Sequence, residues 1–318
     1  MKKTLFFALA ALLFASCAKN EVVELNREAI SFGDAFVENS TRAEDKTYGA
    51  VDLEAFNVYG AVTGTKGTIT IYNGDNVTGE VGNDVWSCTG NQQYWIAGAT
   101  YDFAAVVDAT VAPATGMPTT LTTVADTDMH FKDMLYAQKL DYLGKASEND
   151  KVNFIFEHLL AKAFFTVKSN TEGGYYYSVK KITVNNFATG TYTIAYADAN
   201  ADGKDDGTWA GTTAQDVEFG NIENVRKSDA DGKTNATQQL LVPTTGDFDV
   251  TFTVELWNDN GDAEDVLLST KNETIPVSQD LLKGCVYNFG ISLSVGELIQ
   301  FTVTTDPAWA GTTPVTVL

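Results

Sequence analysis

The sequence predicts an all-β protein built from sandwich domains, and three observations support this fold class. Apolar and polar residues alternate without a fault from Phe248 to Leu256 and again from Cys285 to Leu293. Such alternation is typical of strands that bury one face. Threonine, valine, tyrosine and phenylalanine dominate these runs, and glycine, asparagine and aspartate fill the gaps. No amphipathic helix of about twelve residues is apparent, although residues 133–143 allow a helical turn or two.

The length of 318 residues exceeds one ordinary domain and predicts two. Shorter segments with the same alternation lie at residues 29–36, 56–62, 66–72, 101–107, 151–156, 163–169, 179–184, 191–197 and 299–303. We expect a signal peptide at residues 1–16, a propeptide at 17–42, a first sandwich at 43–150 and a second at 151–318.

The N-terminal residues have the features of a bacterial export signal. Two lysines precede the ten-residue apolar run Leu5–Phe14, and Ala15-Ser16-Cys17 closes it with small residues. The run is too short for a membrane-spanning helix, which needs roughly 20 residues. We therefore predict cleavage before Cys17 and lipidation of its thiol. The alternative is a chance cysteine behind an uncleaved signal.

A hydrophilic stretch separates the first expected strand from the rest of the chain. That strand carries Ile30, Phe32 and Phe36, and residues 38–46 after it hold no core residue. Arg42 is the only arginine between Arg27 and Arg226. An arginine in an exposed, extended segment suits a trypsin-like protease, so the bond between Arg42 and Ala43 is a candidate cleavage site. An ordinary linker is the alternative.

Composition restricts the classes of partner. The net charge is −21 and the pI is about 4.3, and so acidic a surface repels phosphate backbones, which excludes nucleic acid. Apart from Cys17, the cysteines are Cys88 and Cys285. They form either a long-range disulfide or two buried thiols.

One acidic loop has the spacing of a calcium site. Asp198, Asn200, Asp202 and Asp206 stand at positions 1, 3, 5 and 9 of a loop with glycine at position 6, which resembles extracellular calcium loops. Trp209 replaces the bidentate glutamate of an EF-hand at position 12. Calcium is therefore a candidate cofactor, and an acidic, solvated hairpin tip is the alternative.

Enzyme chemistry finds little support in the sequence. The chain has two histidines, His130 and His158, and no nucleophile elbow, zinc motif or phosphate-cradling loop. We expect His158 to be a hydrogen-bonded structural residue, and the protein not to be an enzyme. Several aromatic residues have side chains suited to stacking on sugars, although aromatics at strand spacing more often pack a core: Trp86, Tyr94, Trp95, Tyr101 and Tyr175–Tyr177.

The whole chain resembles the fimbrillin family of Bacteroidales. Six phrases carry the resemblance in the same order: Ala15-Ser16-Cys17, AISF followed by Thr41-Arg42-Ala43, the segment from Trp86 to Val106, FEHLLAKAFFTV (156–167), IPVSQDLLKGCVYNFGISL (275–293) and IQFTVTTDPAW (299–309).

This resemblance implies two tandem transthyretin-like β-sandwich domains and an exported lipoprotein precursor. It implies that an arginine-specific protease cuts after Arg42 and removes the first strand, and that a strand of another fimbrial subunit takes its place. Lipid on Cys17 would hold the precursor in the outer membrane before processing, and the mature subunit would reach the cell-surface fimbrium.

The expected function is therefore that of a structural or accessory fimbrial subunit that supports adhesion. The alternative is a monomeric surface lipoprotein that binds glycan. The last residues, AGTTPVTVL (310–318), suit either insertion into a neighbouring subunit or an ordinary edge strand. Stalk, tip and anchor positions stay open.

Overall fold

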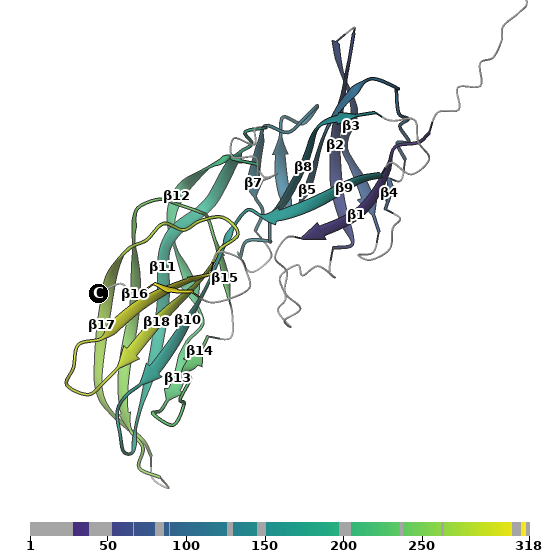
Figure 1. Ribbon diagram of the computed structural model, residues 1–318. Coiled ribbons are helices and arrows are strands. Elements are labelled where there is room, and N and C mark those ends of the chain that lie inside the picture. The colour runs from purple at the N-terminus through teal and green to yellow at the C-terminus, as the bar shows by residue number, and fades with distance from the viewer. Residues whose placement is uncertain are drawn as a thin grey trace, which may run out of the picture.

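The computed structural model describes residues 28–37, 53–65, 67–79, 86–88, 90–125, 130–144, 151–196, 205–235, 238–261, 264–306 and 313–315. Within these ranges the chain forms strands, turns and bends and no helix, which confirms the all-β prediction. No helix of the described residues is long and apolar enough to cross a membrane. The strands form two bodies that lie end to end (Figure 1).

The first body is a seven-stranded sheet. Its order is β1 (Ser31–Val37), β9 (Lys151–His158), β8 (Leu135–Leu143), β5 (Thr100–Val107), β2 (Ala55–Gly64), β3 (Gly67–Thr78) and β4 (Ser87–Cys88). The sheet curls until its two ends meet, because Phe32 of β1 forms a bridge with Trp86 just before β4. The curled sheet encloses one apolar core to which β1, β2, β5 and β9 all contribute.

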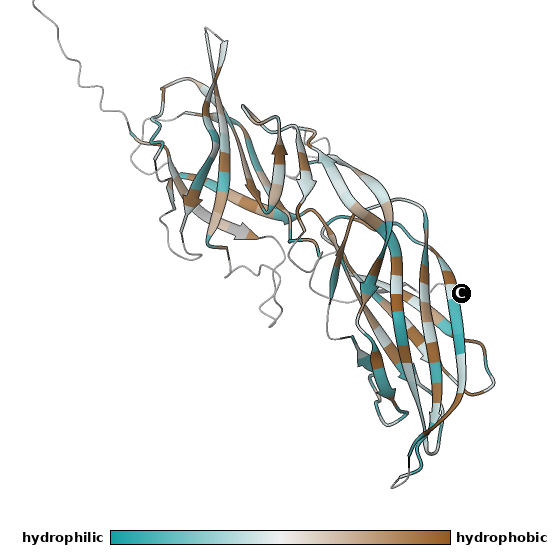
Figure 2. Ribbon diagram, turned by 180° about the vertical axis from the view of Figure 1, so that it is seen from behind, coloured by the Kyte–Doolittle hydropathy of each residue, from teal (hydrophilic) through white to brown (hydrophobic). Residues whose placement is uncertain are grey.

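The second body is a sandwich of two sheets. One contains β14 (Lys233–Thr234), β10 (Ala161–Ser169), β18 (Val286–Leu293), β19 (Gln300–Asp306) and β20 (Thr313–Val315), with β15 (Gln239–Leu241) also on β10. The other contains β17 (Val266–Ser278), β16 (Asp247–Asn258), β11 (Tyr175–Thr193), β7 (Thr120–Thr123) and β6 (Ala109–Ala112), with β12 (Thr208–Phe219) and β13 (Ile222–Val225) also on β11. Hydrophobic and hydrophilic bands alternate along these strands (Figure 2), and the apolar side chains meet in a second core.

The chain passes between the bodies from β5 to β6, from β7 to β8 and from β9 to β10, and the last passage runs through two buried leucines. Strand β9 ends at His158 and β10 begins at Ala161, and Leu159 and Leu160 between them are fully buried. They belong to a third apolar cluster with residues of both bodies, among them Tyr136 and Tyr192. We expected the second domain to begin at residue 151, where β9 starts. However, β9 pairs within the first sheet and packs in its core. The boundary after β9 therefore lies at residues 159–160.

Residues 133–143 do not form the helical turn that we allowed for. They include β8, which pairs with β5 along its length and with β9 at its start. Leu135, Tyr136 and Ala137 are buried one after another, so the start of β8 lacks the alternation of a strand with one buried face. The segments expected at 179–184 and 191–197 prove to be parts of one 19-residue strand, β11, up to Thr193.

Candidate functional site

Strand β1 is held inside the first body by neighbours on both sides (Figure 1). It pairs in parallel with β9 on one side. On the other side the Ile30 amide donates to the Gln93 carbonyl at 2.8 Å, the Trp95 amide to Glu28 at 2.9 Å and the Trp86 amide to Phe32 at 3.4 Å. Removal of β1 would therefore leave a slot bounded by β9 on one side and by Trp86 and residues 93–95 on the other.

The inward side chains of β1 lie at the centre of the first core. Phe32 is 1% exposed, Ala35 and Val37 are buried with it, and so is Ile30 just before the strand. The ring of Phe32 lies 5.6–6.5 Å from four others, between centroids: those of Phe56, Tyr72, Phe103 and Phe154. These four residues come from β2, β3, β5 and β9. One side chain of β1 thus joins four strands of the sheet.

A β-bulge interrupts the pairing between β1 and β9. Phe32 lies opposite Val152 and Ala35 opposite Phe154, so two residues of β1, Gly33 and Asp34, face the single residue Asn153. The bulge shifts the buried positions of β1 from 30 and 32 to 35 and 37. We had expected Phe36 to continue the apolar face, but its side chain lies outside what the structure describes.

Other predicted site residues fall outside the described ranges. Cys17, Arg42 and Ala43 all do so, and lipidation and cleavage stay predictions. Of the calcium loop, Asp198, Asn200 and Asp202 are outside as well, and only Asp206 is described. The calcium site therefore also stays a prediction.

A polar cluster that sequence reasoning missed lies where the two bodies meet. The Lys283 ammonium lies 2.9 Å from Glu157 Oε2 and donates to the Asp205 carbonyl at 2.6 Å and to the Tyr192 hydroxyl at 3.0 Å. Asp205 Oδ1 accepts the Ala195 amide at 2.9 Å. Burial raises the pKa of Glu157, and the nearby Lys283 ammonium offsets part of this rise. Burial raises the pKa of Asp205 as well. The three charges are remote in sequence, so no local motif reveals them.

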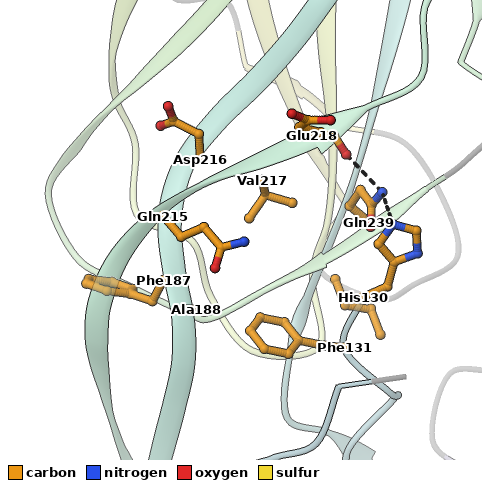
Figure 3. Close-up of a pocket in the computed structure, with 10 residues that line it drawn as sticks. His130, Phe131, Phe187, Ala188, Gln215, Asp216, Val217, Glu218 and Gln239 are labelled. Carbon is orange, nitrogen blue, oxygen red and sulfur yellow. Dashed lines mark hydrogen bonds between the residues drawn. The ribbon is translucent and has the colours of Figure 1, made fainter. Parts of the chain in front are cut away.

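The two histidines occupy separate places. His158 is buried and its Nδ1 lies 3.0 Å from Asp133 Oδ1, which confirms the expected structural role. His130 lies beside a cavity of about 260 Å³ at the side of β12 (Figure 3). There the Gln239 amide contacts His130 Nε2 at 3.3 Å and donates to the Glu218 carbonyl at 2.9 Å, so Gln239 links β12 with β15.

Most of the aromatic residues that we considered for sugar stacking pack the interior. Trp86, Trp95, Tyr101, Tyr176 and Tyr177 are buried, and Tyr94 and Tyr175 are exposed. These residues therefore do not form a continuous aromatic surface on which a sugar could stack.

The cysteines and residues 313–315 are also placed. Cys88 belongs to β4 in the first body and Cys285 lies in the second, and no disulfide joins them. Residues Thr313–Val315 form β20, which pairs antiparallel with Val303–Thr305 of β19. In this structure that part of the tail is an edge strand.

Comparisons with known proteins give a consistent result. The model of the fimbrillin-like family matches residues 41–307. Among curated protein sequences, none matches this chain. A solved fimbrial protein from Bacteroides vulgatus ATCC 8482 is 14% identical, with a TM-score of 0.64 over 90% of this chain and 100% of that one.

Two further solved structures are similar over most of the chain. A putative cell adhesion protein from Bacteroides uniformis ATCC 8492 is 19% identical, with a TM-score of 0.51 over 89% of this chain and 99% of that one. Another, from Bacteroides ovatus ATCC 8483, is 15% identical, with a TM-score of 0.51 over 92% and 99%. At these identities the likeness establishes a common fold.

Proposed function

Because this chain belongs to the fimbrillin-like family, we propose that it is a structural or accessory subunit of a cell-surface fimbria that supports adhesion. In this proposal it is exported as a lipoprotein, lipid on Cys17 holds it in the outer membrane, and an arginine-specific protease cuts after Arg42. The cut frees β1, and a strand of another subunit replaces it. Each domain is transthyretin-like in this proposal.

The placement of β1 is the observation that carries the proposal. It is the first described strand, it lies between two neighbours, and its apolar side chains complete the core. Three buried side chains of residues 30–37 are large, those of Ile30, Phe32 and Val37. At roughly 1.5–3 kcal/mol each, they contribute on the order of 5–9 kcal/mol before entropy losses. A replacing strand would recover this burial and the backbone hydrogen bonds, which supports a stable junction between subunits.

In this proposal the attached β1 keeps the precursor monomeric. As long as residues 38–52 join β1 to β2, the slot is filled by its own chain at a very high effective concentration. Cleavage removes that advantage, so a strand from outside competes with β1 on equal terms. Assembly thereby depends on the protease.

The proposal is tested on material from the surface of the native host. We expect mass spectrometry to find a mature chain that begins at Ala43, in high-mass ladders that resist SDS. An Arg42→Lys variant keeps the charge but denies an arginine-specific protease its residue, so it should remain a single chain with lipidated Cys17. Ladders of the same mass from this variant would disprove protease-triggered assembly.

A monomeric lipoprotein that binds glycan is the outcome to be excluded. A single, uncut and acylated chain from wild-type cells would favour it. The burial of Trp86, Trp95 and Tyr101 does not support this alternative, because a sugar needs an exposed ring.

Calcium at the acidic loop is a separate proposal. If Asp198, Asn200, Asp202 and Asp206 bind the ion, calcium raises the melting temperature of the wild-type chain and not that of Asp202→Ala. No shift in the wild type would dispose of this site.

A further inference from the structure

Exposed apolar side chains gather at the two ends of the molecule. The outer end of the first body carries Ile69, Tyr94, Ile96 and Leu143, which we call the first end patch. The outer end of the second body carries Tyr175, Val266, Leu267, Leu268, Val295 and Leu298, the second end patch. Of the other described residues, only Ile155 and Leu282 are large, apolar and exposed. Single exposed residues of this kind are common, but groups of them mark contact sites.

The first end patch surrounds the start of β5. Leu143 pairs with the first residue of that strand. The Tyr101 hydroxyl accepts a hydrogen bond from the Ile96 amide at 2.6 Å and donates one to the Tyr94 carbonyl at 3.5 Å. Ile69 of β3 lies in the same row as Tyr101, since β2 pairs one residue with both. The four exposed side chains therefore belong to one end of the curled sheet.

The same end holds the entrance to the β1 slot. Ala29, just before β1, forms a bridge with Tyr94, and the Trp95 amide donates to the Glu28 carbonyl at 2.9 Å. A strand that replaces β1 in the same direction therefore enters the slot beside Tyr94. When such a strand follows the body of its own subunit in the sequence, that body lies next to the first end patch.

The second end patch contains three exposed apolar residues in succession. Val266, Leu267 and Leu268 begin β17, which is an edge strand in the described sheet, and they are 44–49% exposed. Tyr175 begins β11 and lies in the same cross-strand row as Val266. Three exposed apolar residues in a row on a sheet edge are a liability for a soluble protein unless a partner covers them.

The other sheet of the second body contributes to the same end. The turn after β18 carries Val295, whose amide donates to the Thr171 hydroxyl at 3.1 Å. Thr171 belongs to the loop that leads from β10 to Tyr175. Leu298, which follows Val295 closely, is 86% exposed. The second end patch therefore spans both sheets of the sandwich.

The two patches differ in composition and lie at opposite ends of an elongated molecule (Figure 1). A contact between two different patches is heterologous, so each copy that binds leaves a free patch for the next. We propose that the first end patch of one copy binds the second end patch of another copy of this chain, so that copies stack head to tail. This contact goes beyond the proposed function, because it forms without strand exchange.

The direction of β20 favours the head-to-tail order. Strand β19 begins at the outer end of the second body, because Gln300 pairs with Ser292 near the end of β18. Strand β20 is antiparallel to β19, so it runs toward the second end patch. Head-to-tail order sets the end toward which β20 runs beside the entrance of the next β1 slot. A head-to-head pair would instead place two slot entrances against each other.

The contact is weak by itself, as interfaces of limited area are. A strand held in the slot of a neighbour raises the effective concentration of the two patches to about 1 mM. A contact with a dissociation constant near that value is then formed about half of the time. It thereby restricts the angle between successive subunits, which a strand on a flexible linker leaves free.

Sedimentation velocity of the uncut chain, with Cys17→Ser to prevent lipidation, tests the contact. Strand β1 fills its slot in this chain, so the result does not depend on strand exchange. Salt at about 0.3 M screens the repulsion between chains of net charge −21. Between about 10 µM and 1 mM, we expect association with a dissociation constant of about 1 mM or below.

Two double variants each remove one patch. Ile96→Asp with Leu143→Asp, and Leu267→Asp with Leu268→Asp, should each raise the dissociation constant at least about ten-fold. An equal mixture of the two variants should form dimers and no larger species. One intact patch of each kind remains in that mixture, and the two patches lie on different chains.

A third double variant is the matched control. Ile155→Asp with Leu282→Asp adds the same two charges at the exposed apolar residues outside the two ends. It should associate as the wild type does. All of these positions are exposed, so the urea midpoints of the three variants should stay close to that of the wild type, which checks that each one folds.

Three outcomes would overturn the inference. One is a wild type that stays monomeric up to about 1 mM. Another is undiminished association of either end variant alone, which would mean that like patches bind each other or that the contact lies elsewhere. The third is a mixture of the two variants that stays monomeric. The SDS-resistant ladders from the native host report on strand exchange separately, so either proposal can fail while the other stands.

Discussion

Phe32 is the residue through which β1 contributes most to the first core. Its ring contacts rings from four strands and is 1% exposed. We expect Phe32→Ala to lower the free energy of unfolding of the uncut chain by about 3–5 kcal/mol, the usual cost of a phenylalanine cavity in a core. Urea denaturation measures this change.

Ile155 on the neighbouring strand serves as the control. It is 66% exposed on β9, so Ile155→Ser should change the free energy of unfolding by less than about 0.5 kcal/mol. A loss below about 1 kcal/mol for Phe32→Ala would mean that the core closes without β1, and the slot would then offer little to a partner.

Lys283 is the residue that compensates the buried charge between the two bodies. Its ammonium lies 2.9 Å from the Glu157 carboxylate, whose pKa burial holds above its ordinary value of 4.5. The folded protein therefore binds this proton more tightly than the unfolded chain does. Glu157 favours folding below pH 4.5 and loses that contribution as the pH rises through its folded pKa.

The pH dependence of a Lys283→Met variant follows from this sign. Loss of the lysine raises the pKa of Glu157 further, because the ammonium no longer stabilises the carboxylate. We expect a destabilisation of about 2–3 kcal/mol at pH 8, where Glu157 is charged. At pH 4 about 1 kcal/mol should remain, from the lost hydrogen bonds to Asp205 and Tyr192.

Urea denaturation at the two pH values checks this difference. Lys271→Met is the matched control, since the Lys271 side chain is 63% exposed in its ion pair with Glu273. It should change stability by less than about 1 kcal/mol at either pH. Equal losses for Lys283→Met at pH 4 and pH 8 would contradict the charge argument.

At the scale of elements, alternation in the sequence locates the strands that bury one face. It identifies β16 and β18 correctly because Phe248 to Leu256 and Cys285 to Leu293 change face at every residue. It fails at the start of β8, where Leu135 to Ala137 are all buried. The bulge in β1 was hidden because Ala35, Phe36 and Val37 are all apolar, so either phase fits the sequence.

The candidate site was predictable only in part, because a sequence pattern describes one strand and not the neighbours of that strand in the sheet. The sequence indicates a separable first strand, since a hydrophilic stretch with Arg42 follows it. It does not indicate the rings around Phe32, because they come from four strands spread between residues 56 and 154. Contacts between residues so far apart in sequence depend on the order of strands in the sheet, and no local sequence pattern predicts that order.

A prediction at the scale of elements concerns strand β20. It covers the outer edge of β19 over Val303–Thr305, with Pro314 opposite Thr304. Proline lacks an amide and is tolerated on an edge strand. A chain that ends at residue 306 should exchange the β19 amides that face β20 faster, while the β18 amides keep their protection.

Hydrogen exchange measured by NMR or mass spectrometry resolves the two strands. The overall stability of the shortened chain should fall by less than about 1 kcal/mol, because Val303 stays paired with Phe289 of β18. Unchanged protection throughout β19 would mean that β20 does not cover this edge in solution.

At the scale of the whole molecule, a shared apolar cluster and an ion pair connect the two cores. The last passage of the chain between them holds two buried leucines, and the β6–β7 hairpin, inserted between β5 and β8 of the first body, pairs with β11 of the second. Lys283 adds a polar tie between β9 and the second body. A fimbrial subunit that transmits tension along a fibre would benefit from such a joint.

Leu160→Ala tests whether the two cores unfold together. Leu160 is fully buried in the cluster between the bodies, so its truncation should cost about 2–5 kcal/mol. Because the lost contacts are those that couple the cores, we expect calorimetry to show one transition for the wild type and two for this variant. Leu293→Ala removes the same atoms from the second core alone and should lower stability while one transition persists. A single, shifted transition for Leu160→Ala would mean that the remaining contacts, among them Tyr136, Tyr192 and Lys283, suffice to hold the bodies together.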